Sequence, residues 1–141
     1  KIITPERLVL EEIVDQVTLP TLEGEITILP EHIPVIVGLK SGDIVAQSGG
    51  EPIPFAVSGG FVEVKTAIDG NTEVAVLADF AEHVADITDE AIANARAKSE
   101  ELKKQMEDKG AVGFEHFEAE LERSLTRVKI ADKWRTKKYR K

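Results

Sequence analysis

The chain has 141 residues, 42% of them apolar and 31% charged, which is typical of a soluble globular protein with one ordinary or two small domains. No apolar run approaches the roughly 20 residues that cross a bilayer, and the start lacks the pattern of a secretion signal. The absence of cysteine excludes disulfides, thiolate metal sites and a cysteine nucleophile. The net charge of -8 is uneven, because residues 1–85 hold 14 acids and 4 bases whereas residues 121–141 hold 2 acids and 9 bases. We therefore expect the basic end to meet an acidic surface of protein, nucleic acid or lipid.

The first 85 residues have the pattern of a small all-β domain. All six prolines and eight of the ten glycines lie before residue 71. Between them, β-branched runs recur about every ten residues, which predicts an antiparallel β-sandwich or barrel. The predicted strands are 12–19, 25–29, 35–39, 43–47, 53–57, 61–66 and 72–77. Glycine-containing turns are predicted at 22–24, 40–42, 48–50, 58–60 and 69–71.

From residue 86 onward the apolar spacing changes to about 3.6, which predicts two helices. Thr88 is the expected N-cap of the first helix, and Asp89 and Glu90 suit its positive end. The pattern breaks at 108–113, so we expect an α+β chain in which an antiparallel helical hairpin (86–141) follows the sandwich (1–85). The narrow apolar seam of this hairpin buries little surface, so we expect the hairpin to detach easily from the sandwich. The predicted stripes are Ile92, Ala95, Ser99, Leu102 and Met106, then Phe114, Phe117, Leu121, Leu125, Val128 and Ala131.

Catalytic, metal and cofactor sites are not predicted. Ser58 lacks the full nucleophile-elbow pattern, and the two Ser-Gly-Gly segments lack the Gly-Lys-Ser/Thr ending of a phosphate loop. The neighbours Glu31 and His32 point to opposite faces of a strand, as do Glu82 and His83, so neither pair forms a chelate. Nucleic-acid binding is disfavoured, because residues 1–120 carry a net charge of -15.

The segment 17–34, with Gly24-Glu25, Ile28-Leu29-Pro30 and His32-Ile33-Pro34, closely resembles the signature of the epsilon subunit of bacterial F-type rotary ATP synthases. Segments 58–64 and 76–82 agree with the same family. The resemblance implies a non-catalytic central-stalk subunit that couples proton translocation to ATP synthesis. Its sandwich (1–85) would bind the gamma subunit and rest on the c-subunit ring through Glu25, Glu31 and His32. The membrane contact would come only through the complex, at the cytoplasmic face of the bacterial inner membrane.

The resemblance also implies that the hairpin (86–141) is regulatory. In its extended state the hairpin inhibits ATP hydrolysis, and its bases contact an acidic segment of the beta subunit. The bases at these positions are Arg123, Arg127, Lys129 and Lys133.

The alternative is an ATP-responsive module whose hairpin senses nucleotide through Arg123 and Arg127. Thr88 and Ala91 stand where nucleotide-binding relatives have an acid and an arginine, which disfavours this alternative. A shifted register that uses Asp89 and Arg96 remains open.

Overall fold

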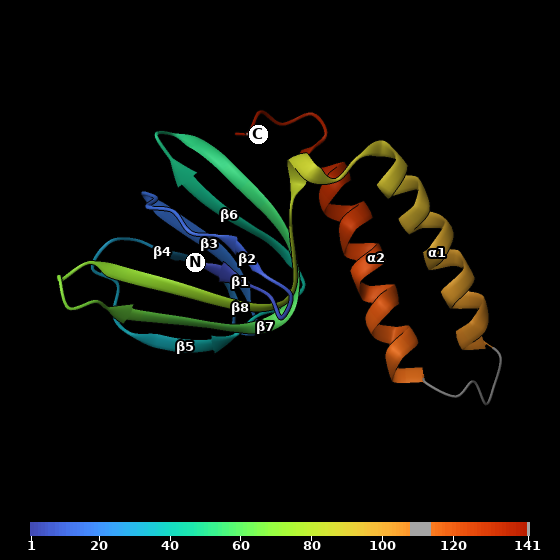
Figure 1. Ribbon diagram of the computed structural model, residues 1–141, viewed down its shortest axis with the longest axis horizontal. Coiled ribbons are helices and arrows are strands. Elements are labelled where there is room, and N and C mark those ends of the chain that lie inside the picture. Colours follow the sequence, from blue (N-terminus) through green and yellow to red (C-terminus); the bar gives the residue numbers. More distant parts are fainter. Residues whose placement is uncertain (108–113, 141) are drawn as a thin grey trace.

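The computed structural model describes residues 1–107 and 114–140, with positions 106 and 114–117 described in backbone only. A β-sandwich forms one part of the molecule, and two antiparallel helices lie against one end of it (Figure 1). The predicted α+β fold is confirmed. Its elements are β1 (Ile2–Ile3), β2 (Leu8–Leu10), β3 (Gln16–Thr21), β4 (Gly24–Ile28), β5 (Val35–Gly38), β6 (Gly42–Ser48), β7 (Glu51–Thr66), β8 (Thr72–His83), the short 3-10 helix η1 (Val84–Asp86), α1 (Asp89–Glu107) and α2 (Phe114–Trp134).

The eight strands belong to one continuous sheet that curls around its own core. The order is β2-β1-β8-β7-β6-β3-β4, and β5 also pairs with β7. The first half of β7 pairs with β6 and its second half with β5, while β8 pairs along both halves. Burial alternates along β3, where Val17, Leu19 and Thr21 are buried, whereas β7 is buried on both faces from Ile53 to Ser58.

The sharpest departure from the predicted strands lies at Gly59 and Gly60. Residues 58–60 were expected to form a turn between two strands, but β7 runs through them without interruption. Both glycines have positive φ, and a Cβ on Gly60 would lie 2.0 Å from the carbonyl oxygen of Leu77. The predicted turn is therefore wrong: the pair is a bend at which β7 passes from one side of the sandwich to the other.

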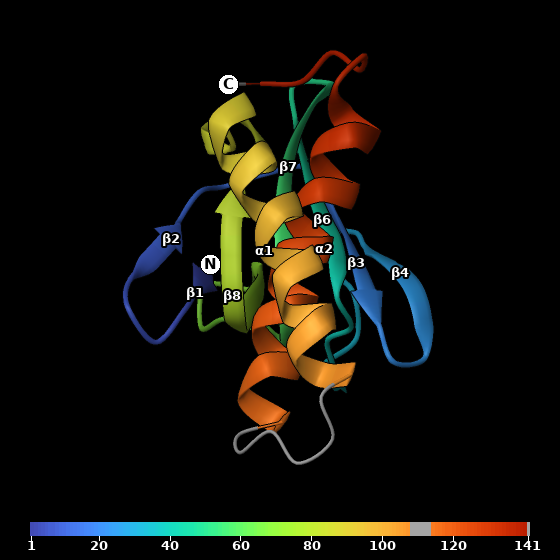
Figure 2. The same cartoon turned by 90° about the vertical axis from the view of Figure 1, so that its right-hand side faces the viewer.

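Helix α2 lies between the sandwich and α1 (Figures 1 and 2). Thr88 caps α1 as predicted, because its Oγ1 accepts a hydrogen bond from the backbone N–H of Ala91 at 3.0 Å. A second apolar cluster joins the hairpin to the outside of β7 and to η1. Its buried members are Ala56, Val84, Ile87, Ile92, Ile130, Ala131 and Trp134.

The predicted stripe of α1 is confirmed where it is described, since Ile92, Ala95, Ser99 and Leu102 are buried. The stripe of α2 is wrong at Leu125, which is 42% exposed, and Leu121 and Val128 are only half-buried. The physical reason is that α2 buries two faces, one toward α1 and one toward the sandwich. Among the described side chains of α2, the buried ones are Ser124, Thr126, Ile130, Ala131 and Trp134. The side chains of Met106, Phe114 and Phe117 lie outside the described residues.

Candidate functional site: the basic face of the C-terminal helix

The sandwich-facing side of α2 carries bases that meet carboxylates of the β-strands. Arg127 Nε donates to Glu82 Oε2 on β8 at 2.9 Å. Lys133 Nζ donates to Asp43 Oδ2 on β6 at 2.8 Å, and Trp134 Nε1 donates to the same oxygen at 2.9 Å. The Asp43 side chain is only 10% exposed, so it needs these two donors to offset its desolvation. The acidic surface expected for the basic end is thus present within this chain.

Arg123 and Arg127, the two arginines singled out from the sequence, share one aromatic platform. Their guanidinium carbons lie 5.9 and 4.9 Å from the ring centroid of Phe80 on β8. Arg123 Nη2 also donates to the carbonyl oxygen of Asp79 at 3.4 Å. Cation–π contacts of this kind stabilise a partly exposed pair by about 0.5–1 kcal/mol each. Both guanidinium groups therefore face the sandwich, whereas Lys129 is exposed to solvent.

A second group of contacts lies beyond the end of α2, at residues 135–140. Both terminal nitrogens of Arg140 donate to the two carboxylate oxygens of Glu12, and this arginine lowers the pKa of Glu12. The backbone N–H of Arg140 donates to the carbonyl oxygen of Pro52 at 2.9 Å. Sequence reasoning missed this contact because no local spacing relates residues so far apart in the chain.

The residues that could form a shifted nucleotide site are held in two separate places. Arg96 Nη2 donates to Asp132 Oδ2 at 2.9 Å. An open pocket beside this pair is lined by Asp89, Ile92, Ala93, Arg96 and Arg135, without Arg123 or Arg127. Arg123 and Arg127 lie elsewhere and bind β8, through the carbonyl oxygen of Asp79 and the carboxylate of Glu82.

The three residues predicted to face the ring do not form one cluster. Glu25 is exposed on β4, whereas Glu31 and His32 lie in the loop that follows it. That loop contacts the start of β8, because the backbone N–H of Glu31 donates to Thr72 Oγ1 at 2.7 Å. It lies at the end of the sandwich away from the helices (Figure 1). Exposed apolar side chains accompany it there, namely Leu29, Ile33 and Ile68.

The outer face of the sheet carries an apolar row that sequence reasoning missed. In the strand register Leu8 lies opposite Ile3, Ile3 opposite Leu77, and Leu77 opposite Phe61. Neighbours in register share one face of a sheet. Phe61 is 62% exposed and Leu77 52% exposed, and Ile36 on β5 is exposed nearby. We call these five side chains the outer apolar row.

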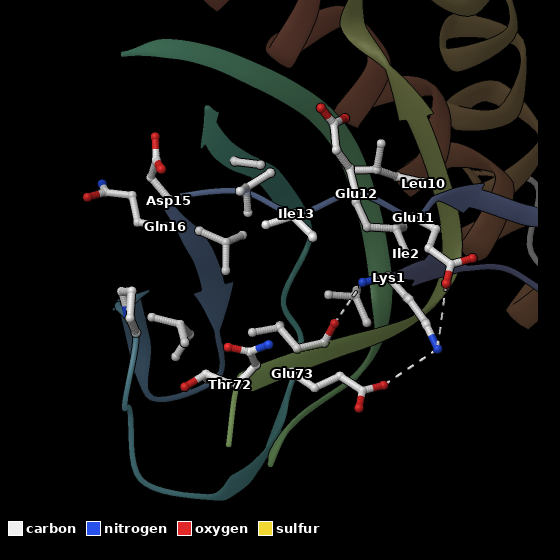
Figure 3. A pocket seen from close by; sticks show the side chains of 18 of the residues that line it. Lys1, Ile2, Leu10, Glu11, Glu12, Ile13, Asp15, Gln16, Thr72 and Glu73 are labelled. Atoms are coloured by element: carbon white, nitrogen blue, oxygen red, sulfur yellow. Dashed lines mark hydrogen bonds and ion pairs between the residues drawn. The ribbon is translucent and has the colours of Figure 1, made fainter. Parts of the chain in front are cut away.

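A groove of about 820 Å³ opens between β1, β3 and β8 (Figure 3). Its floor is the sandwich core, and its rim carries carboxylates, of which Glu11 and Glu73 pair with Lys1. The lining contains no histidine or serine. In residues 1–107 and 114–140 no three potential metal ligands come together, and no helix is long and apolar enough to span a membrane.

Comparison with known proteins assigns the chain to a family. A family model for the ATP synthase, Delta/Epsilon chain, beta-sandwich domain matches residues 1–84, which defines the class of protein. The ATP synthase epsilon chain of Desulforamulus reducens is 38% identical over 132 residues, which cover 93% of this chain and 94% of the relative. That of Dehalococcoides mccartyi is 40% identical over 136 residues, covering 95% and 91%. The chain belongs to the ATP synthase epsilon-chain family.

Solved structures show the same fold. A chain in the cryo-EM structure of the Euglena gracilis mitochondrial ATP synthase, which contains OSCP, F1 and the c-ring, is 25% identical with a TM-score of 0.66. The match covers 87% of this chain and 73% of that one. A chain from the central stalk and c-ring of the Tetrahymena thermophila mitochondrial ATP synthase is 14% identical with a TM-score of 0.50, covering 96% and 93%, which is a likeness of fold alone.

Proposed function

We propose that this chain is a non-catalytic rotor subunit whose hairpin restrains ATP hydrolysis when it leaves the sandwich. The observation that carries the proposal is the pairing of Arg127 with Glu82 and of Lys133 with Asp43. In the compact state these bases are occupied by carboxylates of the same chain. They become available to an acidic segment of the beta subunit only after α2 has lifted.

The switch is therefore an exchange of acidic partners. A ligand or partner shifts such an equilibrium only through contacts that differ between the two states. The sandwich carboxylates favour the compact state, and the beta subunit favours the extended one. Because Arg127 is 38% exposed and Glu82 20% exposed, their pair stabilises the compact state only modestly, by about 1 kcal/mol or less.

Two substitutions should change hydrolysis in opposite directions. Glu82→Gln weakens the compact state but leaves the arginine, so we expect ATP hydrolysis by the assembled enzyme to fall, by about two- to fivefold if the extended state is at least as populated as the compact one. Replacing Arg123 and Arg127 by alanine removes the contact to the beta subunit, so hydrolysis should rise. The measurement is steady-state ATPase activity of purified complexes with equal subunit content.

Glu63→Gln is the matched control, because Glu63 is a partly exposed acid in the half of β7 that pairs with β5, and its partner is Lys65. It should leave hydrolysis unchanged. If Glu82→Gln and the double arginine variant shift activity in the same direction, the exchange of partners is refuted.

The sandwich offers two separate surfaces for the rest of the rotor. We assign the outer apolar row to the gamma subunit, because large exposed apolar side chains in one row mark a protein interface. We assign the loop end with Glu31 and His32, together with Glu25, to the c-ring. Charged loops on a rigid scaffold suit a contact with polar loops. The chain would then be a peripheral protein at the cytoplasmic face of the bacterial inner membrane, held there by the complex.

One paired experiment separates the two surfaces. Phe61→Asp should weaken capture by purified gamma subunit by roughly tenfold or more, since it buries a charge in the interface. The double variant Glu25→Gln with His32→Ala should bind gamma normally but lower proton-driven ATP synthesis in membrane vesicles. Normal gamma capture by Phe61→Asp would exclude the outer apolar row, and full coupling in the double variant would exclude the loop end.

A further inference from the structure

The chain after α2 folds back over the sandwich instead of extending into solvent. Figure 1 shows this segment passing from the end of α2 toward the strands. Arg140 reaches two separate parts of the sandwich. Its guanidinium group pairs with Glu12, and its backbone N–H bonds to Pro52 at the start of β7.

Aromatic contacts connect this segment to α2 and to the sandwich. Tyr139 stacks edge-on against Trp134, with ring centroids 6.0 Å apart, and its ring lies 6.4 Å from that of His83. His83 contacts Phe55 of the sandwich core at 4.9 Å. A continuous row of four rings therefore links the end of α2 to the core, across the point where the chain leaves β8.

The position of this segment lets it hold α2 against the sandwich. The hairpin is joined covalently to the sandwich only through the residues between β8 and α1. Lifting α2 must therefore move its C-terminal end, which packs beside η1, away from β6 and β7. Residues 135–140 bind the sandwich beyond that end, so α2 cannot lift until their contacts break. Both charged partners are partly exposed, at 38% for Arg140 and 29% for Glu12, so the contact is weak enough to open.

We propose that residues 135–140 are a latch that sets how often the hairpin leaves the sandwich, with the Arg140–Glu12 pair and the Tyr139–His83 contact as its two fastenings. The inference rests on the proposed function only in that both require the hairpin to lift. It assigns a regulatory role to Glu12, a residue outside the hairpin.

A thiol reporter tests the latch in the isolated full chain, which has no cysteine of its own. Ala56 is fully buried in the cluster between β7 and the hairpin, so the thiol introduced by Ala56→Cys reacts only when the hairpin lifts or the chain unfolds. Val57 is fully buried in the sandwich core, so Val57→Cys reports unfolding alone. The measurement is the labelling rate with a small thiol reagent, which follows the open population when reclosing is fast.

We expect Glu12→Gln and Arg140→Gln each to speed labelling at position 56 by about two- to fivefold, and the double variant to add little more because both remove one pair. Tyr139→Ala removes the Tyr139–His83 contact, so its effect on the labelling rate at position 56 should add to that of Glu12→Gln or of Arg140→Gln. Labelling at position 57 rises at most by the same factor, because unfolding also breaks the pair, and in every variant it should stay much slower than labelling at position 56. Lys138→Gln is the matched control, because Lys138 is an exposed base of the same segment.

Unchanged labelling at position 56 in the Glu12 and Arg140 variants would overturn the latch, and so would labelling at position 57 that is as fast as at position 56, because the thiol at position 56 would then report unfolding alone. Neither result depends on inhibition, which is measured in the assembled enzyme. If the Glu12 and Arg140 variants label faster at position 56 but Glu82→Gln leaves ATP hydrolysis unchanged, the latch is supported and the proposed function is refuted. The reverse pattern would keep the proposed function and refute the latch.

Discussion

Glu31 has a backbone conformation that its residue type rarely adopts. Its φ of 69° is the only positive value at a non-glycine residue in the described part of the chain. The left-handed region costs an ordinary L residue roughly 1–2 kcal/mol. The hydrogen bond from its N–H to Thr72 helps to hold the loop in this shape. Strain of this kind concentrates at functional positions, which is consistent with the role proposed for the loop end.

Relieving this strain should stabilise the chain. Asparagine tolerates the left-handed region better than glutamate, so Glu31→Asn should raise the free energy of unfolding by up to about 1 kcal/mol. The measurement is equilibrium unfolding in urea. Glu25→Asn is the control, because asparagine is disfavoured in a strand such as β4 and should give no gain. A loss of stability in Glu31→Asn would show that the glutamate side chain itself supports the loop.

At the scale of single elements, the local features were predictable from the sequence and the bend in β7 was not. Thr88 and the acids after it have the standard order of a helix start, and Phe61 to Lys65 alternates as a half-buried strand does. Gly59 and Gly60 were misread because positive φ serves a turn and a bend equally well. Only the backbone of β8 beside them distinguishes the two cases.

Helix α2 shows why the candidate site was only half predictable. Its bases could be found from charge alone, and Arg123 and Arg127 do lie together. Their acidic partners in the compact state could not be found from the sequence. Glu82 lies 45 positions from Arg127 and Asp43 lies 90 positions from Lys133, and both look like ordinary surface acids in the sequence. A helix that packs against two neighbours also has no single stripe, which is why Leu125 was assigned to the wrong face.

At the scale of the whole molecule, His83 stands where the sandwich, the hairpin and the C-terminal segment meet. It ends β8, and its Nδ1 accepts a hydrogen bond from the backbone N–H of Ala85 at 2.9 Å. A neutral ring is needed for that bond. Burial lowers the pKa of His83, and the charge of Asp86 and the backbone of Arg140 oppose this only in part. The folded chain therefore holds this imidazole in its uncharged form.

Acidification should consequently destabilise the compact molecule as the pH falls below neutral. The pKa of His83 is lower in the folded chain than its ordinary value of 6.5, so the unfolded chain binds the extra proton as the pH falls through 6.5. The free energy of unfolding should decrease below that pH, with a slope of at most about 1.4 kcal/mol per pH unit for one proton. His83→Asn keeps an acceptor for Ala85 but cannot titrate, so its slope should be shallower. Urea unfolding at pH 7.5, 6.5 and 5.5 measures both slopes, and equal slopes in the two proteins would exclude His83 as their source.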